Sequence, residues 1–241
     1  MKETLYQHRV ISIPQTTGTR VYTNLIKADD CYEFLTGIAI IANAAPTADE
    51  VKIELRDDFN PVLSFSPFNN WIKNPSSQSF NLQDLFKPFN VKARGYNFYV
   101  NIKVTNCNAF SFTVILRQSV NALQCTKYDE QCFDVATPLL GSSYEITLPS
   151  NYNFCKGIML TGGDQVNGNF IGLDIYDAGG AIVDPVPLSM LTPSINTPYD
   201  LGFFPVDFES KSRQIKVRLT ELGTLPQAYT STNFTITFLL V

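Results

Sequence analysis

The clearest regularity in the chain is an alternation of apolar and charged residues over Val51–Arg56. A period of two is typical of a β-strand with one buried and one solvated face. The nearly continuous apolar run Phe34–Ala42 predicts a strand that is covered on both faces. Other short runs are rich in β-branched and aromatic residues and are bounded by Gly, Pro and polar clusters, which also indicates strands. The remaining expected strands are Val10–Ile13, Arg20–Ile26, Val62–Pro67, Asn97–Thr105, Phe110–Gln118, Ser143–Leu148, Lys156–Leu160, Phe170–Tyr176, Ala181–Val183, Arg213–Leu219 and Asn233–Val241.

Two segments stand outside this strand pattern. Residues 1–9 form a polar lead-in, and Gln15–Thr19 has the composition of a turn. Helical spacing is rare in this chain. Leu82, Leu85 and Phe86 lie at i, i+3 and i+4, which predicts one or two helical turns over Ser79–Phe86.

The strand pattern occurs twice. The segment Tyr32–Leu63 matches Tyr152–Val183 at a constant offset of 120 residues and includes a shared Tyr-x-Phe-x-x-Gly-Ile motif. Asp57 falls on Asp177, and the alternating apolar positions of the two segments coincide. Phe112–Leu116 also parallels Phe234–Phe238, with the offset grown to 122 residues. We therefore interpret the chain as two copies of one small domain.

This duplication sets the predicted domain boundaries. The first domain covers residues 1–119, the second covers residues 138–241, and residues 120–137 form a linker or a crossing segment. Each copy has one long connection late in its order, Pro67–Pro88 in the first and Pro185–Pro205 in the second. Seven or eight short strands with one long connection indicate a sandwich of antiparallel sheets. The predicted fold is all-β, with two tandem jelly-roll-like β-sandwich domains that arise from an internal duplication.

An immunoglobulin-like sandwich is the alternative fold for each copy. It would be favoured by a Cys…Trp…Cys spacing. The only tryptophan, Trp71, lies just after an expected strand and has no such spacing. We therefore expect a jelly roll in preference to an immunoglobulin-like sandwich.

The charge composition argues against one class of partner, nucleic acid. Only 17% of the 241 residues are charged, and the formal net charge is −4. No basic cluster of the kind that binds a phosphate backbone is present, so we expect no direct nucleic-acid binding. The N-terminus lacks the apolar core of a signal peptide, and no apolar run reaches the length of a membrane span. These features predict a soluble protein that is made in the cytoplasm.

The five cysteines, Cys31, Cys107, Cys125, Cys132 and Cys155, have no Cys-x-x-Cys pair among them. Their spacing fits neither a zinc site nor a small disulfide framework. We expect free thiols, several of them in the core. A bridge between Cys125 and Cys132 is the alternative.

Candidate chemistry is sparse. The only histidine, His8, lies in the polar lead-in without a serine or aspartate motif nearby, which argues against a Ser-His-Asp triad. Asp57 and Asp58, beside Asn60, and Asp174 and Asp177 lie at strand ends, where they could bind calcium or cap turns. No feature selects a carboxylate pair for glycoside hydrolysis. We therefore predict no catalytic, cofactor-binding or metal-binding residue.

Two other features have a structural and a functional interpretation. Gly162-Gly163 and Gly179-Gly180 do not fit the nucleotide-binding glycine motifs, and hairpin turns explain both. Tyr96, Phe98 and Tyr99, or Trp71, could form a sugar-stacking platform. Their position in or beside strands also fits ordinary core packing.

The whole-chain duplication, together with the motif segment Tyr32–Leu63, resembles the double jelly-roll capsid proteins of tail-less, corticovirus-like bacteriophages. The resemblance concerns architecture and covers nearly the whole chain. It implies a homotrimer of pseudo-hexameric outline that tiles a viral shell and contacts other virion proteins, with an internal membrane possible beneath. This sequence is shorter than most members and lacks a clear N-terminal helix.

We accordingly expect a non-enzymatic virion structural protein that self-assembles, without a cofactor, after synthesis in the host cytoplasm. One alternative is a carbohydrate-binding or adhesin module, which predicts a monomer with an aromatic ligand site. Another is a head-decoration or tail structural protein of a tailed phage, in which tandem β-sandwiches also occur.

Overall fold

The computed structural model describes residues 4–42, 45–72, 85–122, 129–164, 166–193 and 202–241. The chain divides into two compact units, and the second unit begins at Asp129. The helical elements within the described ranges are two short turns, the 3-10 turn η1 (Phe68–Asn70) and the helix α1 (Leu188–Leu191). No helix in these ranges is long and apolar enough to cross a membrane. The all-β prediction is confirmed.

The first domain contains eight strands. They are β1 (Thr4–Ile13), β2 (Thr16–Lys27), β3 (Phe34–Ile41), β4 (Ala48–Asp57), β5 (Pro61–Pro67), β6 (Lys87–Lys92), β7 (Asn97–Cys107) and β8 (Phe110–Ser119).

The second domain also contains eight strands. They are β9 (Asp129–Val135), β10 (Ser143–Thr147), β11 (Phe154–Gly162), β12 (Ile171–Asp177), β13 (Gly180–Pro187), β14 (Phe204–Glu209), β15 (Gln214–Glu221) and β16 (Phe234–Leu240).

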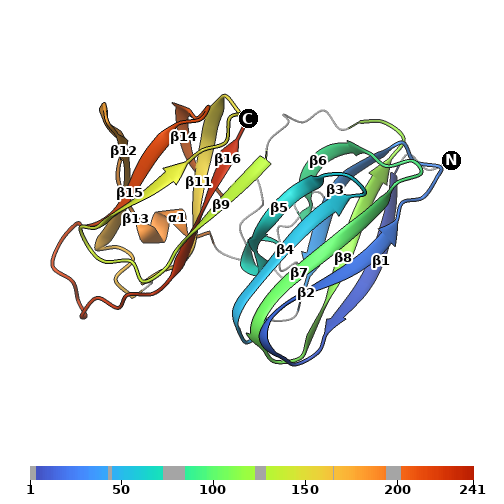
Figure 1. The fold of residues 1–241 in the computed structure, drawn as a ribbon, viewed down its shortest axis with the longest axis horizontal. Helices are drawn as coiled ribbons and strands as arrows, with labels where there is room; N and C mark the ends of the chain where they lie inside the picture. The colour runs from blue at the N-terminus through green and yellow to red at the C-terminus, as the bar shows by residue number, and fades with distance from the viewer. Residues whose placement is uncertain (1–3, 43–44, 73–84, 123–128, 165, 194–201) are drawn as a thin grey trace. The chain divides into compact units, whose positions relative to one another are not determined.

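Both domains have the same sheet topology. In the first domain one sheet has the order β1-β8-β3-β6 and the other the order β2-β7-β4-β5. The second domain repeats these orders as β9-β16-β11-β14 and β10-β15-β12-β13, and every pairing is antiparallel (Figure 1). Two four-stranded sheets whose strands are ordered first-eighth-third-sixth and second-seventh-fourth-fifth make a jelly roll. The chain is therefore a tandem of two jelly-roll sandwiches.

Each domain has its own apolar core between its two sheets. In the first domain the alternating side chains Ile53 and Leu55 of β4 are fully buried with Phe98 of β7. In the second domain Leu173 and Ile175 of β12 occupy the equivalent positions and pack with Phe238. Burial of a large apolar side chain contributes about 1.5–3 kcal/mol, so these matched positions explain why the alternation is present in both copies.

The strand β3 is covered on both faces, as the continuous apolar run predicts. Ile38 and Ile40 point into the main core, whereas Ala39 lies in a separate small cluster with Leu85, Phe86 and Ile115. The residues that precede β6 therefore cover the outer face of this sheet. Tyr6 of β1 extends the cover, since its ring centroid lies 5.5 Å from that of Phe86.

The glycine shared by the two copies lies beside a β-bulge. The register of β3 shifts between Leu35 and Gly37, and the register of β11 shifts between Cys155 and Gly157. A Cβ atom placed on Gly157 would lie 2.7 Å from the Cβ of Phe203, and one placed on Gly37 would lie 3.2 Å from the Cβ of Phe86. In both domains the residue before the sixth strand thus packs over a glycine because no side chain occupies that space.

The structure corrects several expectations about element boundaries. The expected lead-in 1–9 contains most of β1, and the expected turn Gln15–Thr19 contains the start of β2. These residues form strands because β1 pairs with β8 and β2 pairs with β7 along most of their length. Such cross-strand pairing outweighs a weak local sequence preference. Residues 120–137 contain β9, which pairs with β16 and is the first strand of the second domain.

Two further expectations concern the helix and the glycine pairs. The helical turn expected over Ser79–Phe86 falls mostly outside the described residues. Gly162-Gly163 is not a hairpin turn, since β11 and β12 belong to different sheets. Gly179-Gly180 does lie in a hairpin, between the paired strands β12 and β13.

Candidate interaction surfaces

The aspartates considered for calcium serve as turn clamps and ion-pair partners. Asp57 Oδ1 accepts hydrogen bonds from the backbone N–H groups of Phe59 and Asn60, at 2.7 and 2.6 Å. Asp177 occupies the same place in the second domain, where Oδ1 accepts from the N–H of Gly179 at 2.7 Å. The one charged identity of the repeat thus closes the same hairpin in both domains.

Asp177 and Asp174 are also held by arginines. Asp177 Oδ2 accepts from Arg213 Nε and Nη2 at 3.0 and 2.6 Å, and these hydrogen bonds lower the pKa of the Asp177 carboxyl. Asp174 Oδ2 accepts from Arg218 Nη2 at 2.6 Å, which raises the pKa of the guanidinium. Within the described ranges, no three His, Cys, Asp or Glu side chains are grouped to hold a metal ion.

Of the two interpretations of the aromatic residues, core packing is correct for Trp71 and Phe98. Trp71 and Phe98 are buried in the core of the first domain. Tyr96 packs edge-on against Phe59, and Tyr99 donates its hydroxyl hydrogen to Asp58 Oδ1 at 2.8 Å, which lowers the pKa of the Asp58 carboxyl. These aromatic side chains do not share one exposed face, because residues in and beside β7 alternate between core and surface.

Among the described residues, the histidine and the cysteines form no reactive cluster. His8 is exposed on β1 opposite Ile115. Cys107 and Cys155 are buried, and burial raises the pKa of the Cys155 thiol to about 12. Cys31 is exposed. The bridge considered between Cys125 and Cys132 involves Cys125, which lies outside the described residues.

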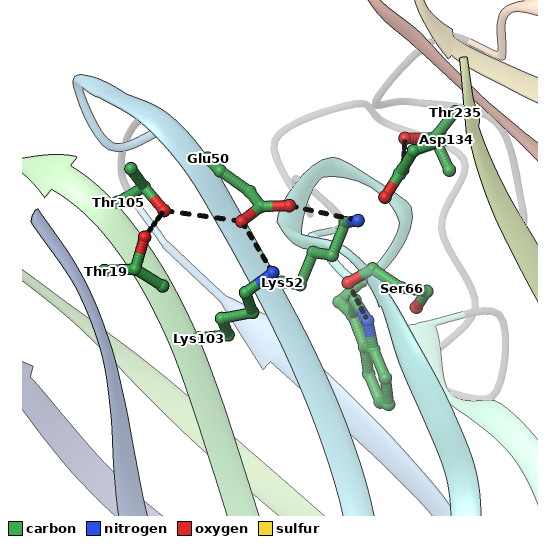
Figure 2. A network of polar contacts seen from close by, with 9 residues as sticks. Thr19, Glu50, Lys52, Ser66, Lys103, Thr105, Asp134 and Thr235 are labelled. Carbon is green, nitrogen blue, oxygen red and sulfur yellow. Dashed lines mark hydrogen bonds and ion pairs between the residues drawn. The ribbon is translucent and has the colours of Figure 1, made fainter. Parts of the chain in front are cut away.

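The outer face of the β2-β7-β4-β5 sheet carries a polar network centred on Glu50 (Figure 2). The Glu50 carboxylate lies 3.1 Å from Lys52 Nζ and 3.0 Å from Lys103 Nζ. Burial alone would raise the pKa of Glu50, but the two lysines outweigh this effect and lower the pKa. Thr105 and Thr19 extend the network across β7 to β2. Over β4 and β7 this face is polar and internally paired, whereas Val21 and Leu25 of β2 expose apolar side chains on it.

The corresponding face of the second domain is paired in the same way. In the first domain Glu54 of β4 accepts a hydrogen bond from Asn101 Nδ2 of the paired strand β7 at 2.7 Å. In the second domain the corresponding residue of β12, Asp174, binds Arg218 of the paired strand β15. Lys216 and Glu145 form a neighbouring ion pair at 3.2 Å. Several charged side chains on both faces are therefore held by neighbours on the same face.

One end of the second domain differs clearly from that of the first. Val135 and Gly162 both pair with Phe234, and Ile171 pairs with Glu221, so the connections at residues 136–142, 163–170 and 222–233 meet at one end. The first domain has shorter connections there, at residues 14–15, 42–47 and 108–109. We call residues 136–142, 163–170 and 222–233 the loop end.

The loop end is nearly uncharged and exposes apolar side chains. Asp164 is the only charged residue in its three segments. Leu139, Val166 and Leu222 are 59%, 63% and 42% exposed, and Phe170 is also exposed. Scattered exposed apolar residues are ordinary, but a group of them on adjoining loops is typical of an interaction surface.

Asp164 fastens the loop end from inside. Its side chain is buried, and its carboxylate accepts from Asn167 Nδ2 at 2.7 Å and from the backbone N–H of Thr230 at 3.2 Å. These hydrogen bonds outweigh burial and lower the pKa of Asp164. Tyr229 donates to the carbonyl of Pro138 at 2.7 Å. The three loops are therefore bonded to one another.

Sequence reasoning missed the loop end because its residues show no periodicity. One signal was available, since Pro67 and Pro187 also differ by 120 residues and precede η1 and α1 in the two domains. A repeat that includes these prolines aligns the strands of the two copies, and it shows that the three loops of the loop end are longer than their counterparts in the first domain.

No family model and no curated protein matches this chain. Among solved structures it is similar to the major capsid protein P2 of bacteriophage PM2, with 9% identity, a TM-score of 0.43 and 97% of both chains covered. It is also similar to the PBCV-1 virus capsid, with 10% identity, a TM-score of 0.44, and 99% of this chain and 94% of that chain covered.

A similar likeness extends to an enzyme. The N-glycanase PNGase F has 9% identity and a TM-score of 0.38, with 98% of this chain and 96% of that chain covered. The fold thus resembles that of double jelly-roll capsid proteins, and the likeness concerns the fold alone.

Proposed function

We propose that this protein is a non-enzymatic structural protein of a virus particle, a capsid protein that self-assembles into the shell. The observation that carries the proposal is the presence of two complete jelly rolls of identical strand order in one chain. Jelly rolls occur as viral capsid and lectin domains and in cupins. A fused pair suits a shell, because each chain supplies two similar building blocks for a closed assembly.

The surfaces are consistent with assembly. Each domain ends its sheets in four edge strands, and an unpaired edge is a ready contact for a neighbouring molecule. The internally paired sheet faces leave the edges and the loop end as the surfaces for partners. On this proposal the protein is made in the host cytoplasm, acts in the virion without a cofactor, and contacts other virion proteins but no nucleic acid directly.

The test is the solution mass of the purified protein, measured by light scattering during size-exclusion chromatography and joined to negative-stain imaging of the same peak. We expect a homotrimer, three times the 26.9 kDa of one chain, with a six-lobed outline, or larger shells. A monomer at every concentration, and also in the presence of the other virion proteins, would contradict the proposal.

The loop end supports a second candidate, a carbohydrate-binding or adhesin module. Its segments are rich in Ser, Thr, Asn and Gly and contain Tyr229 and Phe170, and neutral sugars are bound by such hydroxyl and amide groups together with an apolar or aromatic face. A glycan array distinguishes the candidates. Binding that is lost in Phe170→Ala but kept in Phe59→Ala, a change in the first domain, would favour the module.

A further inference from the structure

The two domains differ in charge although they share one topology. Residues 1–128 contain 13 Lys and Arg against 10 Asp and Glu, a formal charge of +3. Residues 129–241 contain 5 Lys and Arg against 12 Asp and Glu, a formal charge of −7. Stability alone does not require the two copies of a duplicated domain to diverge in charge.

One side of the first domain carries cations without acidic residues. β1 and β2 are end strands of its two sheets and lie side by side (Figure 1). The two strands contain Arg9, Arg20 and Lys27 and no acidic residue. All three cations are exposed, and none has an ion pair within the part of the chain that the structure describes. We call this side the β1–β2 edge.

The arginines of the β1–β2 edge are placed for a lateral contact. Side chains alternate between the two faces of a strand. Arg9 therefore lies on the same face of β1 as the buried Ile11, and Arg20 lies on the same face of β2 as the buried Ile26. Both are nevertheless exposed, because β1 and β2 are end strands and no further strand covers these positions. Both arginines are therefore accessible to a neighbouring molecule.

Protection of a sheet edge does not explain this surface fully. Charged residues on edge strands do prevent unwanted strand pairing. However, the two strands carry these cations without any acidic residue, and Val10, Val21 and Leu25 on the outer faces of the same strands are 66%, 55% and 51% exposed. Cations without an ion pair, flanked on both outer faces of the sandwich by exposed aliphatic side chains, are available to a neighbouring molecule.

The second domain has a complementary side. β13 and β14 are the end strands opposite β10 and β9 in its two sheets. From Gly180 to Glu209 the sequence contains no Lys or Arg. Asp184, Asp207 and Glu209 are exposed there, and Lys156 pairs with Asp207 at 2.7 Å. We call this side the β13–β14 edge.

The β13–β14 edge is built for side-chain contacts. Pro185, Pro187 and Pro205 have no N–H to donate, which prevents this edge from extending a neighbour's sheet by continuous backbone pairing. Pro185 and Pro205 are exposed and supply apolar surface beside the carboxylates. The partner of this edge is therefore a cationic surface with small exposed aliphatic groups, which describes the β1–β2 edge.

We propose that the β1–β2 edge of one copy binds the β13–β14 edge of another copy, so that the chains associate head to tail. The contact is heterologous and closes into a ring or continues as a chain of copies. Contacts between two first domains or two second domains through these edges would bring like charges together, which favours alternation of the domains. This inference rests on the proposed self-assembly and names its surfaces.

Charge reversal tests the pairing. One variant carries Arg9→Glu and Arg20→Glu, and a second carries Asp184→Lys and Glu209→Lys. Sedimentation velocity at low salt should show that each variant alone associates at least about tenfold more weakly than the wild type, because like charges then face each other. An equimolar mixture of the two variants should recover association, since each reversed edge meets a reversed partner.

A matched control changes the same number of charges elsewhere. Lys92→Glu with Arg94→Glu reverses two exposed cations at the β6 side of the first domain, the opposite end of the β1-β8-β3-β6 sheet. This variant should associate like the wild type. Recovery in the mixture also shows that the edge variants are folded.

The outcomes separate the two proposals. If the wild type assembles but the edge variants assemble equally well, or the mixture does not recover, the assigned edges are wrong while self-assembly stands. If the control variant loses association as well, the contact depends on overall charge and the assignment is overturned. A wild type that stays monomeric overturns both proposals.

Discussion

The glycine beside the bulge of β11 offers a sharp test of the duplicated architecture. Replacing Gly157 by alanine adds one methyl group, and that atom would lie 2.7 Å from the Cβ of Phe203. Carbon atoms in contact prefer separations of about 3.5–4.0 Å, so the backbone of β11 or of Phe203 must move. Overpacking of this kind typically costs about 1–3 kcal/mol.

The first domain supplies an internal comparison. At Gly37 the nearest atoms to an added Cβ are Arg117 Nη2 at 3.1 Å and the Cβ of Phe86 at 3.2 Å. These neighbours need to move less than the Cβ of Phe203, which lies at 2.7 Å from the Cβ added at Gly157. Gly37→Ala should therefore cost less than Gly157→Ala, although both glycines occupy the same place in their repeats.

The assay can separate the domains because Trp71 is the only tryptophan and is buried in the first domain. Its fluorescence reports the first domain during urea unfolding, and far-ultraviolet circular dichroism reports both domains. Gly157→Ala should lower the dichroism midpoint of the second domain and leave the fluorescence midpoint unchanged. In thermal unfolding, a loss of 1 kcal/mol in the free energy of unfolding lowers the Tm of a domain of about 100 residues by roughly 4–8 °C.

A second-site change tests the cause. In Phe203→Ala the Cβ remains, so the cost of adding Gly157→Ala should persist. In Phe203→Gly the Cβ is absent, so the same addition should cost much less. The steric reasoning fails if Gly157→Ala is no more costly than Gly37→Ala, or if its cost is equal in the two Phe203 backgrounds.

Three further predictions follow from single contacts. Asp177→Asn should remove part of the acid sensitivity of the second domain. The folded-state pKa of Asp177 is lowered, so its contribution to the free energy of unfolding is present above the ordinary carboxyl pKa of about 3.9 and is lost as the pH falls through the lower folded-state pKa. The stabilities of variant and wild type, measured by circular dichroism over a range of pH, should therefore converge at low pH. Parallel curves would contradict this. Asp164→Ala should cost about 1–3 kcal/mol, because the buried Asn167 loses its acceptor and the link to the Thr230 N–H is broken. Hydrogen exchange should rise at residues 166–170 and 222–233 but not at β15. Unchanged exchange would show that Asp164 does not fasten the loops. Burial raises the pKa of Cys155 to about 12, so this thiol should resist iodoacetamide at pH 8 in the native protein, whereas the exposed Cys31 should be alkylated. Peptide mass mapping measures the alkylation of both cysteines. Equal labelling would be inconsistent with a buried Cys155.

The sequence alone determined the fold class and the duplication. Period-two alternation at Val51–Arg56 reflects the geometry of a strand with one buried face, and it appears in any sequence that must fill such a strand. The matched pair Asp57 and Asp177 has a local cause, a hairpin clamp. The matched pair Gly37 and Gly157 was visible only as a repeat, because its cause is a residue that packs from a distant segment.

Tertiary structure decided what depends on pairing between distant segments. The strands β1 and β9 have weak local patterns and are strands because β8 and β16 bond to them along their length. The burial of Trp71 and Phe98, which removed the expected aromatic platform, follows from the packing of two sheets. The β1–β2 edge, the β13–β14 edge and the loop end each combine residues far apart in the chain, and only the order of the strands in the sheets brings them together.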